Sequence, residues 1–482
     1  MLLRLIYEEQ LAQASYLLGC QETGEAIVID PHRDIEQYRD LAAHEGLRIV
    51  AVTETHIHAD FVSGARELAA RTGARLYLSG AGPTEWQYQF AAEAGATLLH
   101  DGDQFTVGAL RLDVWHTPGH TPEHLSFLVT DTAHADAPMG IFTGDFVFVG
   151  DVGRPDLLER AAGQAGTMAA GARDLFGSLA RFRTLPEWVQ VWPGHGAGSA
   201  CGKALGAVPQ TTVGYETRFN PALGYDDAAA FTDFILAGQP DPPPYFARMK
   251  AINRVGPAPV AELAAPRQRT LAELDARRAS GTLIVDTRPV RQYAAGAIPG
   301  TLNLPLDGGF LNWAGWLLSP ERPIALIVAP DDLVRATRLL RLIGLDELAG
   351  FWPVATVAAW FVAGGERATI APIAPEELRA LQASESVTLI DVRNQSERAA
   401  GFIAGSLAIP LGELPSQLVR LPHGGTVTVH CQGGARSAIA ASLLLAERGR
   451  TVRDLTGGFN SWVAAGQPVE HEAEVALVAS RG

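Results

Sequence analysis

The chain has 482 residues, and at roughly 100 to 200 residues per domain this length predicts about three domains. Its 53 Asp and Glu residues outnumber its 38 Lys and Arg residues, and the net charge of -15 argues against nucleic acid or an anionic membrane as the main partner. Hydrophobic residues make up 47% and charged residues 19%, which excludes a mainly disordered chain.

The cysteines Cys20, Cys201 and Cys431 are too few, and odd in number, to form a disulfide framework, which favours a reducing compartment. No run of about 18 apolar residues occurs, so we expect no transmembrane helix. The first ten residues lack the length and the cleavage site of a signal peptide. We therefore expect a cytoplasmic protein that binds neither nucleic acid nor membrane.

Short β-branched runs alternate with amphipathic helical stretches up to about residue 255, for example over 25–30, 35–44 and 48–53. This pattern predicts an α/β domain at residues 1–258, followed by a Pro-rich boundary. Beyond it, residues 286–306 align without gaps on 391–411, with matched Asp, Arg, Gly and Pro positions. Such self-similarity predicts two copies of one α/β domain, at 259–369 and 370–482.

Histidines and aspartates follow four apolar, strand-like runs of the first domain. Because alternate side chains of an extended segment share one side, such clusters can converge on a metal ion. The clustered residues are His56, His58, Asp60, His116, His120, Asp145 and His195.

In their chain order these clusters resemble those of the metallo-β-lactamase superfamily, over about residues 1–250. The resemblance implies an αββα sandwich with metals at one edge of its two sheets. The usual H-x-H-x-D-H pattern is broken because Phe61 follows Asp60. Since the missing histidine belongs to the second metal of that superfamily, the resemblance implies a site for one metal.

One-metal members of the superfamily include the persulfide dioxygenases. By resemblance to them, His56, His120 and Asp145 would hold one Fe(2+) per chain. Two imidazoles and one carboxylate form the facial triad of non-haem iron oxygen chemistry, which leaves positions for a persulfide and O2. The residues that we interpret as supporting the metal site, or as vestigial ligands, are His58, Asp60 and His195.

Three more residues of the first domain carry separate predictions. Arg154 lies in a segment that resembles the stretch of persulfide dioxygenases that binds the thiol carrier; a salt bridge within the domain is the alternative. Cys201 follows His195 in a Gly-rich loop and is a candidate sulfur relay, with a small buried hydrophobic residue as the alternative. Cys20 ends an apolar run, and we expect it to be structural.

The second copy contains a thiol in a distinctive setting. Cys431 ends the β-rich run 426–429 and is followed by a Gly-containing loop that opens a helix at about 438. Backbone N–H groups of such a loop point inward and stabilise a thiolate, so Cys431 is a candidate nucleophile.

The motif C-x-x-G-x-R-S, together with residues 391–410, resembles the rhodanese sulfurtransferases. By resemblance, Cys431 carries a persulfide and Arg436 closes the loop. Gln432 stands where thiosulfate:cyanide enzymes often have a basic residue, which argues against that substrate pair. The remaining loop residues predicted to bind substrate are Gln432, Gly433, Gly434, Ala435 and Ser437.

The first copy has no cysteine, and Asp331 and Asp332 stand where an anion would bind. We interpret this copy as a catalytically blank spacer or docking domain.

The domain order resembles a persulfide dioxygenase–rhodanese fusion, within a multidomain α/β fold. It implies oxidation of a low-molecular-weight thiol persulfide, such as glutathione persulfide, by O2 to sulfite, and a rhodanese step that forms or consumes thiosulfate in sulfide detoxification. One alternative is a zinc-dependent thioester hydrolase of the glyoxalase II type with a sulfur-carrier tail; another is a non-catalytic binding tail. The thiol carrier, the direction of the rhodanese step and a homo-oligomeric state stay open.

Overall fold

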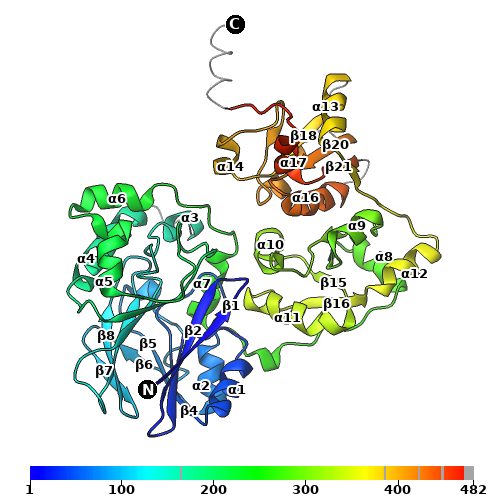
Figure 1. The fold of residues 1–482 in the computed structure, drawn as a ribbon. Coiled ribbons are helices and arrows are strands. Elements are labelled where there is room, and N and C mark those ends of the chain that lie inside the picture. Colours follow the sequence, from blue (N-terminus) through cyan, green and yellow to red (C-terminus); the bar gives the residue numbers. More distant parts are fainter. Residues whose placement is uncertain (163–165, 385–386, 422–423, 447–449, 472–482) are drawn as a thin grey trace. The chain divides into compact units, whose positions relative to one another are not determined.

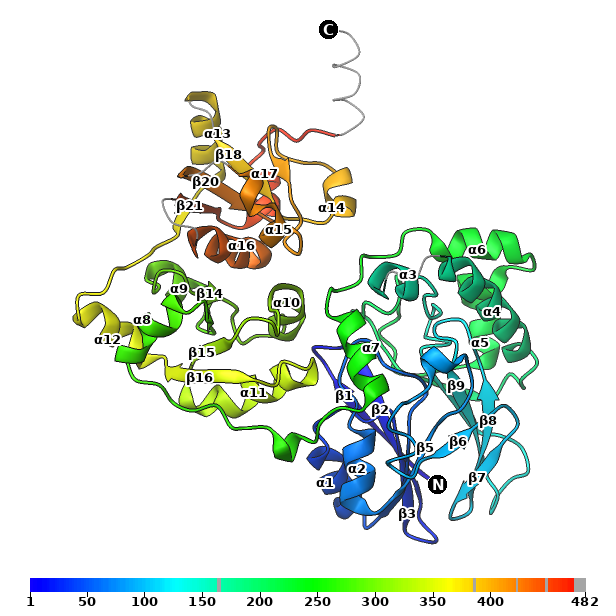
Figure 2. The ribbon, with the colours of Figure 1, turned by 180° about the vertical axis from the view of Figure 1, so that it is seen from behind.

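The computed structural model shows two compact units, which consist of residues 1–263 with 338–346, and of 264–337 with 347–482. No helix in the described part of the chain is long and apolar enough to cross a membrane. Figures 1 and 2 show the chain from opposite sides. The structure describes residues 1–162, 166–384, 387–421, 424–446 and 450–471.

The first unit contains two six-stranded sheets, with strand orders β1-β2-β3-β4-β5-β6 and β12-β11-β10-β9-β8-β7. The strands of the first sheet are β1 (Leu2–Glu8), β2 (Gln13–Cys20), β3 (Glu25–Ile29), β4 (Arg48–Thr53), β5 (Arg75–Ser79) and β6 (Thr97–Leu99). The strands of the second sheet are β7 (Gln104–Val107), β8 (Leu110–His116), β9 (Leu125–Asp131), β10 (Gly140–Gly144), β11 (Gln190–Pro193) and β12 (Thr211–Thr212).

Helices flank both sheets of this unit (Figure 1). The helical elements of the first unit, with η for short 3-10 helices, are α1 (Glu36–His44), α2 (Ala65–Thr72), η1 (Thr84–Trp86), α3 (Leu157–Ala162), α4 (Thr167–Phe182), α5 (Val213–Phe219), η2 (Pro221–Gly224), α6 (Ala228–Leu236), α7 (Phe246–Val255) and η3 (Val260–Glu262).

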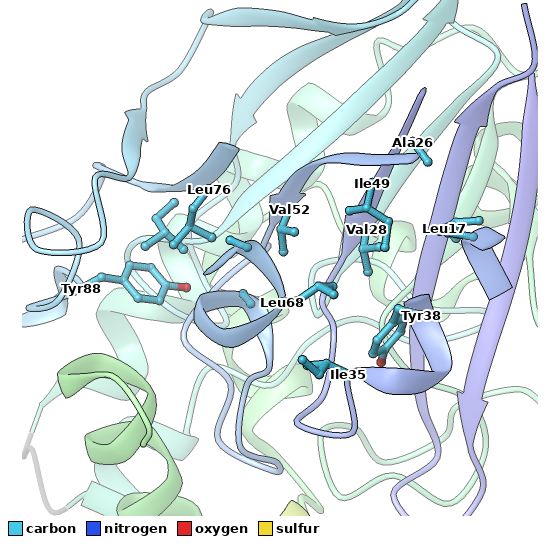
Figure 3. Close-up of a cluster of buried hydrophobic side chains, with 14 of the residues drawn as sticks. Leu17, Ala26, Val28, Ile35, Tyr38, Ile49, Val52, Leu68, Leu76 and Tyr88 are labelled. Carbon is cyan, nitrogen blue, oxygen red and sulfur yellow. The ribbon is translucent and has the colours of Figure 1, made fainter. Parts of the chain in front are cut away.

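Strand β2 shows how the layers form, because all of its residues are buried and alternate side chains point to opposite faces. Leu17 packs with Tyr38 of α1 and Leu68 of α2 in the cluster drawn in Figure 3. Its neighbours Tyr16 and Leu18 pack in a second cluster between the two sheets. A third cluster joins the outer face of the second sheet to α4 and α6. The unit is therefore the predicted αββα sandwich.

The second unit contains two all-parallel sheets, with orders β14-β13-β15-β16 and β19-β18-β20-β21-β17. Their strands are β13 (Leu283–Asp286), β14 (Leu302–Asn303), β15 (Ile324–Val328), β16 (Leu348–Pro353), β17 (Ala371–Ile373), β18 (Thr388–Asp391), β19 (Leu407–Ala408), β20 (Gly425–His430) and β21 (Arg450–Leu455). The helical elements after residue 264 are α8 (Ala272–Ala279), α9 (Val290–Ala295), α10 (Phe310–Leu317), η4 (Pro330–Asp332), α11 (Leu333–Leu342), α12 (Ala355–Val362), α13 (Pro375–Ser384), α14 (Gln395–Ala399), α15 (Leu414–Gln417), η5 (Leu418–Arg420), α16 (Ala435–Ala446) and α17 (Gly458–Ala464).

The two sheets of the second unit repeat one strand order, and they also repeat one buried ion pair. The guanidinium of Arg288 donates to Asp286 and to the carbonyl of Gly296 at 3.0 Å. Arg393 makes the same bonds to Asp391 and to the carbonyl of Gly401, the latter at 2.8 Å. This shared bonding fits the sequence repeat, while the boundaries at 258/259 and 369/370 stay predictions.

Residues 338–346, at the end of α11 and in the turn after it, belong to the first unit. The carbonyl of Leu342 accepts a 2.7 Å hydrogen bond from the N–H of Val62. The guanidinium of Arg248 donates to the carbonyls of Ile343 and Gly344, both at 2.8 Å. Val62 follows the loop that carries His56, His58 and Asp60. Residues 338–346 therefore support this loop, a contact that the interpretation of the first copy as a spacer did not include.

Arg33 provides a test of this support. It is buried and donates to Asp346 at 2.5 Å and to the carbonyl of Ala258 at 2.7 Å. We expect Arg33→Met to lower the free energy of unfolding of the first unit by about 2 to 3 kcal/mol, measured by urea denaturation, because both acceptors lose their donor. Arg39→Met, which removes an exposed pair with Glu36, is the control and should cost less than about 0.5 kcal/mol. Equal losses would contradict the role of the segment.

Candidate functional site

Strand direction brings the predicted metal ligands to one edge of the second sheet. Strands β8 and β10 both run antiparallel to β9, and β10 runs parallel to β11. The carboxyl ends of β8, β10 and β11 therefore lie at the same edge, where they are followed by His120, Asp145 and His195. The loop after β4 of the first sheet adds His56.

The predicted ligands His56, His120 and Asp145 lie together. One ligand atom from each lies within 4.8 Å of the others, and all three side chains are buried. The Asp145 Oδ2 atom lies 3.9 Å from Nε2 of His56 and 3.5 Å from Nε2 of His120. Neither carboxylate oxygen of Asp145 has a hydrogen-bond partner. A buried carboxylate without a partner is costly, and a bound cation would remove that cost.

Hydrogen bonds orient both imidazoles for binding a metal. The Thr55 hydroxyl donates to Asp30 at 2.9 Å, so it accepts the Nδ1–H of His56 at 3.0 Å. The Nδ1–H of His120 donates to the carbonyl of Arg154 at 3.0 Å. With Nδ1 protonated, each ring turns the lone pair of Nε2 toward Asp145.

The electrostatics of these residues also fit a cation. Burial lowers the pKa of both His56 and His120 well below the ordinary value, so both rings are neutral, which metal binding requires. Burial raises the pKa of Asp145 to about 6. Two neutral imidazoles and one carboxylate suit a divalent transition metal such as iron or zinc, and the donor set alone does not choose between them.

His58 points away from these ligands. Its Nε2 lies 3.1 Å from Oδ1 of Asp30. Although burial alone would lower the pKa of His58, the neighbouring Asp30 carboxylate raises it to about 9. The protonated ring lies beside the ring of His56, with centroids 4.2 Å apart, and so places a positive charge next to the centre. A supporting role for His58 stays a prediction that this geometry favours.

Asp60 and His195 form a second group of donors together with Cys201, and their ligand atoms also lie within 4.8 Å of one another. The Nδ1–H of His195 donates to the carbonyl of Ala12 at 3.0 Å, which turns Nε2 toward carboxylates. That Nε2 lies 3.4 Å from Asp60 and 3.4 Å from the other oxygen of Asp145. This group therefore adjoins the first one across the Asp145 carboxylate.

The two cysteines of the first unit are buried. Burial, followed by the negative charges of Asp145 and Asp60, raises the pKa of Cys201 well above its ordinary value. A protonated thiol is a weak nucleophile, so the sulfur relay at Cys201 stays a prediction that the electrostatics do not favour. The sulfur of Cys20 accepts the N–H of Ala109 at 3.4 Å, between buried strands, which fits a structural role.

Arg154 does not have the surroundings of a substrate-binding residue. Its side chain is fully buried, and its guanidinium donates to both carboxylate oxygens of Asp156 at 2.8 and 2.7 Å and to the carbonyl of Ala200. The alternative reading of the sequence, a salt bridge within the domain, is the better one. Because its own carbonyl accepts the Nδ1–H of His120, Arg154 is a positioning residue for the metal ligand.

Sequence reasoning missed several residues of the centre. Asp30 follows β3 in a left-handed conformation with φ 52°, and its carboxylate accepts the N–H of Thr55 at 2.6 Å. The carboxylate of Glu123 accepts the N–H of Ile57 at 2.8 Å. Lys250 belongs to α7 and carries a buried ammonium without a hydrogen-bond partner. A signal was available for Lys250, since it is one of only two lysines in the sequence.

In the second copy, Cys431 lies in the predicted loop between β20 and α16. The cysteine is buried, and the N–H of Gly434 donates to its sulfur at 3.1 Å. Gly434 has φ 106°, a backbone conformation that is strained for any residue with a side chain, which explains the glycine at this position of the loop. Ser437 closes the turn by donating to the carbonyl of Gly434 at 3.1 Å. Gly433 and Ala435 complete the segment.

Side chains around the loop hold its polar groups in place. Arg436 donates to both oxygens of Glu397, at 2.7 and 2.6 Å. The amide of Gln432 accepts from Arg393 at 3.1 Å and donates to Asn460 at 2.6 Å. Since both ends of this amide already have protein partners, the geometry favours a structural role for Gln432 over the predicted substrate contact.

Two family models match the chain. The metallo-beta-lactamase superfamily model matches residues 9–195, and the rhodanese-like domain model matches residues 374–465. The second match covers the copy that contains Cys431, whereas the first copy stays rhodanese-like by prediction only.

Similar proteins and one solved structure extend these matches. The mitochondrial persulfide dioxygenase ETHE1 of Mus musculus is 30% identical over 231 residues, which are 46% of this chain and 76% of that protein. A probable metallo-hydrolase of Burkholderia pseudomallei is 30% identical over 207 residues, 38% of this chain and 67% of that protein. The structure of a metallo-beta-lactamase from Staphylococcus aureus is 42% identical, with a TM-score of 0.66, and the match covers 73% of this chain and 99% of that chain.

The chain therefore belongs to the metallo-β-lactamase superfamily, has persulfide dioxygenases among its relatives, and joins this domain to a rhodanese-like domain. This is the fusion that the sequence motifs predicted.

Asp145→Asn tests the metal centre without relying on activity. We expect the variant to lose bound metal, measured by elemental analysis, while the metal-free variant unfolds at a higher temperature than the metal-free wild type, because a neutral amide is less costly to bury. Burial raises the folded-state pKa of Asp145 from 3.8 to about 6, so this difference should grow as the pH rises across that range. Asp101→Asn, at an exposed aspartate, is the control. Full metal content in Asp145→Asn would contradict the assignment.

Proposed function

We propose that this member of the metallo-β-lactamase superfamily is an Fe(2+)-dependent persulfide dioxygenase joined to a rhodanese sulfurtransferase. It would oxidise a low-molecular-weight thiol persulfide with O2 to sulfite, and Cys431 would form or consume thiosulfate in sulfide detoxification. The observation that supports this most is the buried set of His56, His120 and Asp145, in a chain similar to a protein named as a persulfide dioxygenase. Sulfur compounds are accordingly the expected substrates of both domains.

In the first reaction the protein would hold the metal ion and orient the persulfide substrate. Bound Fe(2+) would supply open coordination positions and the electrons that activate O2. His56 and His120 are fixed through Nδ1, and the protonated His58 adds positive charge beside His56, where a persulfide anion would lie. Phe61 is fully buried and packs on the ring of His58, at 4.4 Å between centroids, in place of the histidine that a second metal would use.

The second reaction is assigned to the Cys431 loop. The thiolate would attack the sulfane sulfur of a donor, forming a cysteine persulfide and releasing the donor's remaining group as its anion. Sulfite would then take that sulfur, forming thiosulfate and returning the thiolate, and the reverse exchange uses the same atoms. The N–H of Gly434 already donates to the sulfur, and Arg436, held by Glu397, places a positive charge at the loop.

One observation favours a second candidate, a zinc-dependent hydrolase. The donors Asp60, His195 and Cys201 adjoin the first set and could hold a second cation. Proteins similar to this chain include one named as a zinc-dependent hydrolase of polyketide biosynthesis, from Bacillus velezensis. Zinc in the purified chain, together with no O2 uptake on addition of glutathione persulfide, would favour the hydrolase and contradict the dioxygenase.

Two substitutions should separate the two activities. We expect His56→Ala to lower O2 uptake with glutathione persulfide by roughly a hundredfold or more, because a metal ligand is lost, and to leave sulfur transfer to cyanide or sulfite unchanged. Cys431→Ser should abolish sulfur transfer and leave O2 uptake unchanged. Oxygen-electrode and thiosulfate assays on the full chain measure both quantities. Loss of both activities in either variant would contradict independent sites, and full sulfur transfer in Cys431→Ser would favour a non-catalytic tail.

A further inference from the structure

Helix α7 is bound to the loop that carries the metal ligands. The hydroxyl of Tyr245, just before the helix, donates to the carbonyl of Asp60 at 3.0 Å. Near the end of the helix, the amide of Asn253 donates to the carbonyls of His58 and Phe61 at 2.8 and 2.7 Å. These bonds hold one face of α7 against the loop after β4.

Lys250 lies between those two attachments and, three residues before Asn253, on the same helix face. Its Nζ atom is buried and has no hydrogen-bond partner. The ammonium lies 4.4 Å from the ring centroid of Trp86, an attraction that leaves its N–H groups unbonded. Among the described residues, no carboxylate lies within ion-pair distance of this atom. A buried ammonium with three donors and no acceptor is costly unless an anion binds beside it.

The charge of Lys250 acts on the metal centre. It contributes, after burial, to lowering the pKa of His120, and it acts in the same direction on His56. The surroundings also act on Lys250. Burial lowers the pKa of its ammonium to about 8, while the negative charges of Glu123, Cys201 and Asp145 raise this pKa. Because Lys250 shares a helix face with Asn253, its ammonium lies on the side of α7 that contacts the loop after β4.

We propose that the ammonium of Lys250 forms an anion subsite beside the metal centre, which binds the negatively charged sulfur group of the substrate. In that subsite, the unbonded N–H groups of Lys250 would donate to the sulfur anion. That the bound anion is a sulfur anion rests on the proposed function. That an anion binds here at all rests on the buried, unbonded ammonium of Lys250. Trp86 forms the apolar wall that keeps the ammonium in place.

The chain offers a matched control, because Lys203 is its other lysine. The ammonium of Lys203 also lies over an aromatic ring, 4.0 Å from the centroid of Phe234. It donates, however, to the carbonyls of Phe234 and Ala237 at 2.8 and 3.2 Å. Two of its three N–H groups therefore already have acceptors, and replacing it should not affect an anion at the metal centre.

The experiment titrates hydrosulfide into the full chain loaded with Co(2+), whose visible absorption responds to anions bound at the metal. We expect Lys250→Met to weaken hydrosulfide binding roughly tenfold or more, because a unit positive charge close to the anion is lost. Lys250→Arg should stay within about threefold of the wild type, and Lys203→Met should be unchanged. Cobalt content and melting temperature are measured for each variant, and Lys250→Gln replaces Lys250→Met if the latter fails to load.

Equal hydrosulfide affinity in the wild type and in the neutral Lys250 variants would overturn the subsite. The same holds if Lys203→Met weakens binding as much as Lys250→Met does. O2 uptake with glutathione persulfide, measured separately on the iron-loaded wild type, tests the proposed oxidation. If hydrosulfide affinity depends on Lys250 but the wild type takes up no O2, the anion subsite is supported and the dioxygenase is contradicted. If the wild type takes up O2 but the Lys250 variants bind hydrosulfide as tightly as it does, the dioxygenase is supported and the subsite is contradicted.

Discussion

The buried carboxylate of Asp145 is the constraint on which the centre of the first unit depends. Both of its oxygens lack a hydrogen-bond partner, and the imidazoles of His56, His120 and His195 turn toward it. The rings of His56 and His120 are neutral and hold their Nδ1 protons on other acceptors, so their Nε2 lone pairs face the carboxylate. Such an arrangement is stable only with positive charge between these groups, and the layers around it fix the donors before any cation arrives.

Residues that are not predicted ligands also hold the ligands in place. Asp30, held at φ 52° after β3, accepts from the N–H and the hydroxyl of Thr55 and also faces His58. One residue in a left-handed conformation thus orients one ligand through Thr55 and keeps His58 protonated. A non-glycine residue in this region is costly, and the three partners that converge on its carboxylate offset that cost. The first sheet therefore supplies the predicted ligand His56 and also the carboxylate of Asp30 that orients it through Thr55.

The sequence predicted those parts of the site that follow from short stretches of the chain. Strand-like runs that end in His or Asp predicted that these side chains meet at one edge, and the resemblance to persulfide dioxygenases chose His56, His120 and Asp145 among them. Lys250 escaped notice because only the packing of α7 against the loop after β4 relates it to residues almost 200 positions earlier in the chain. For Arg154 the sequence left two roles open, a contact with the thiol carrier and a salt bridge within the domain. The sequence shows a guanidinium, but only the fold shows that Asp156 and Ala200 occupy it.

The two copies in the second unit show that the fold and the chemistry can be separated. Both keep the buried Asp–Arg pair and its bond to a glycine carbonyl, which join the first strand to the turn after the next helix. They diverge where β15 runs into Pro330, whereas β20 runs into Cys431. Because the shared pair lies away from this difference, it can support the fold of each copy whether or not a thiol is present. Residues 338–346 of the first copy pack within the first unit, where the carbonyl of Leu342 accepts the N–H of Val62 beside the loop after β4.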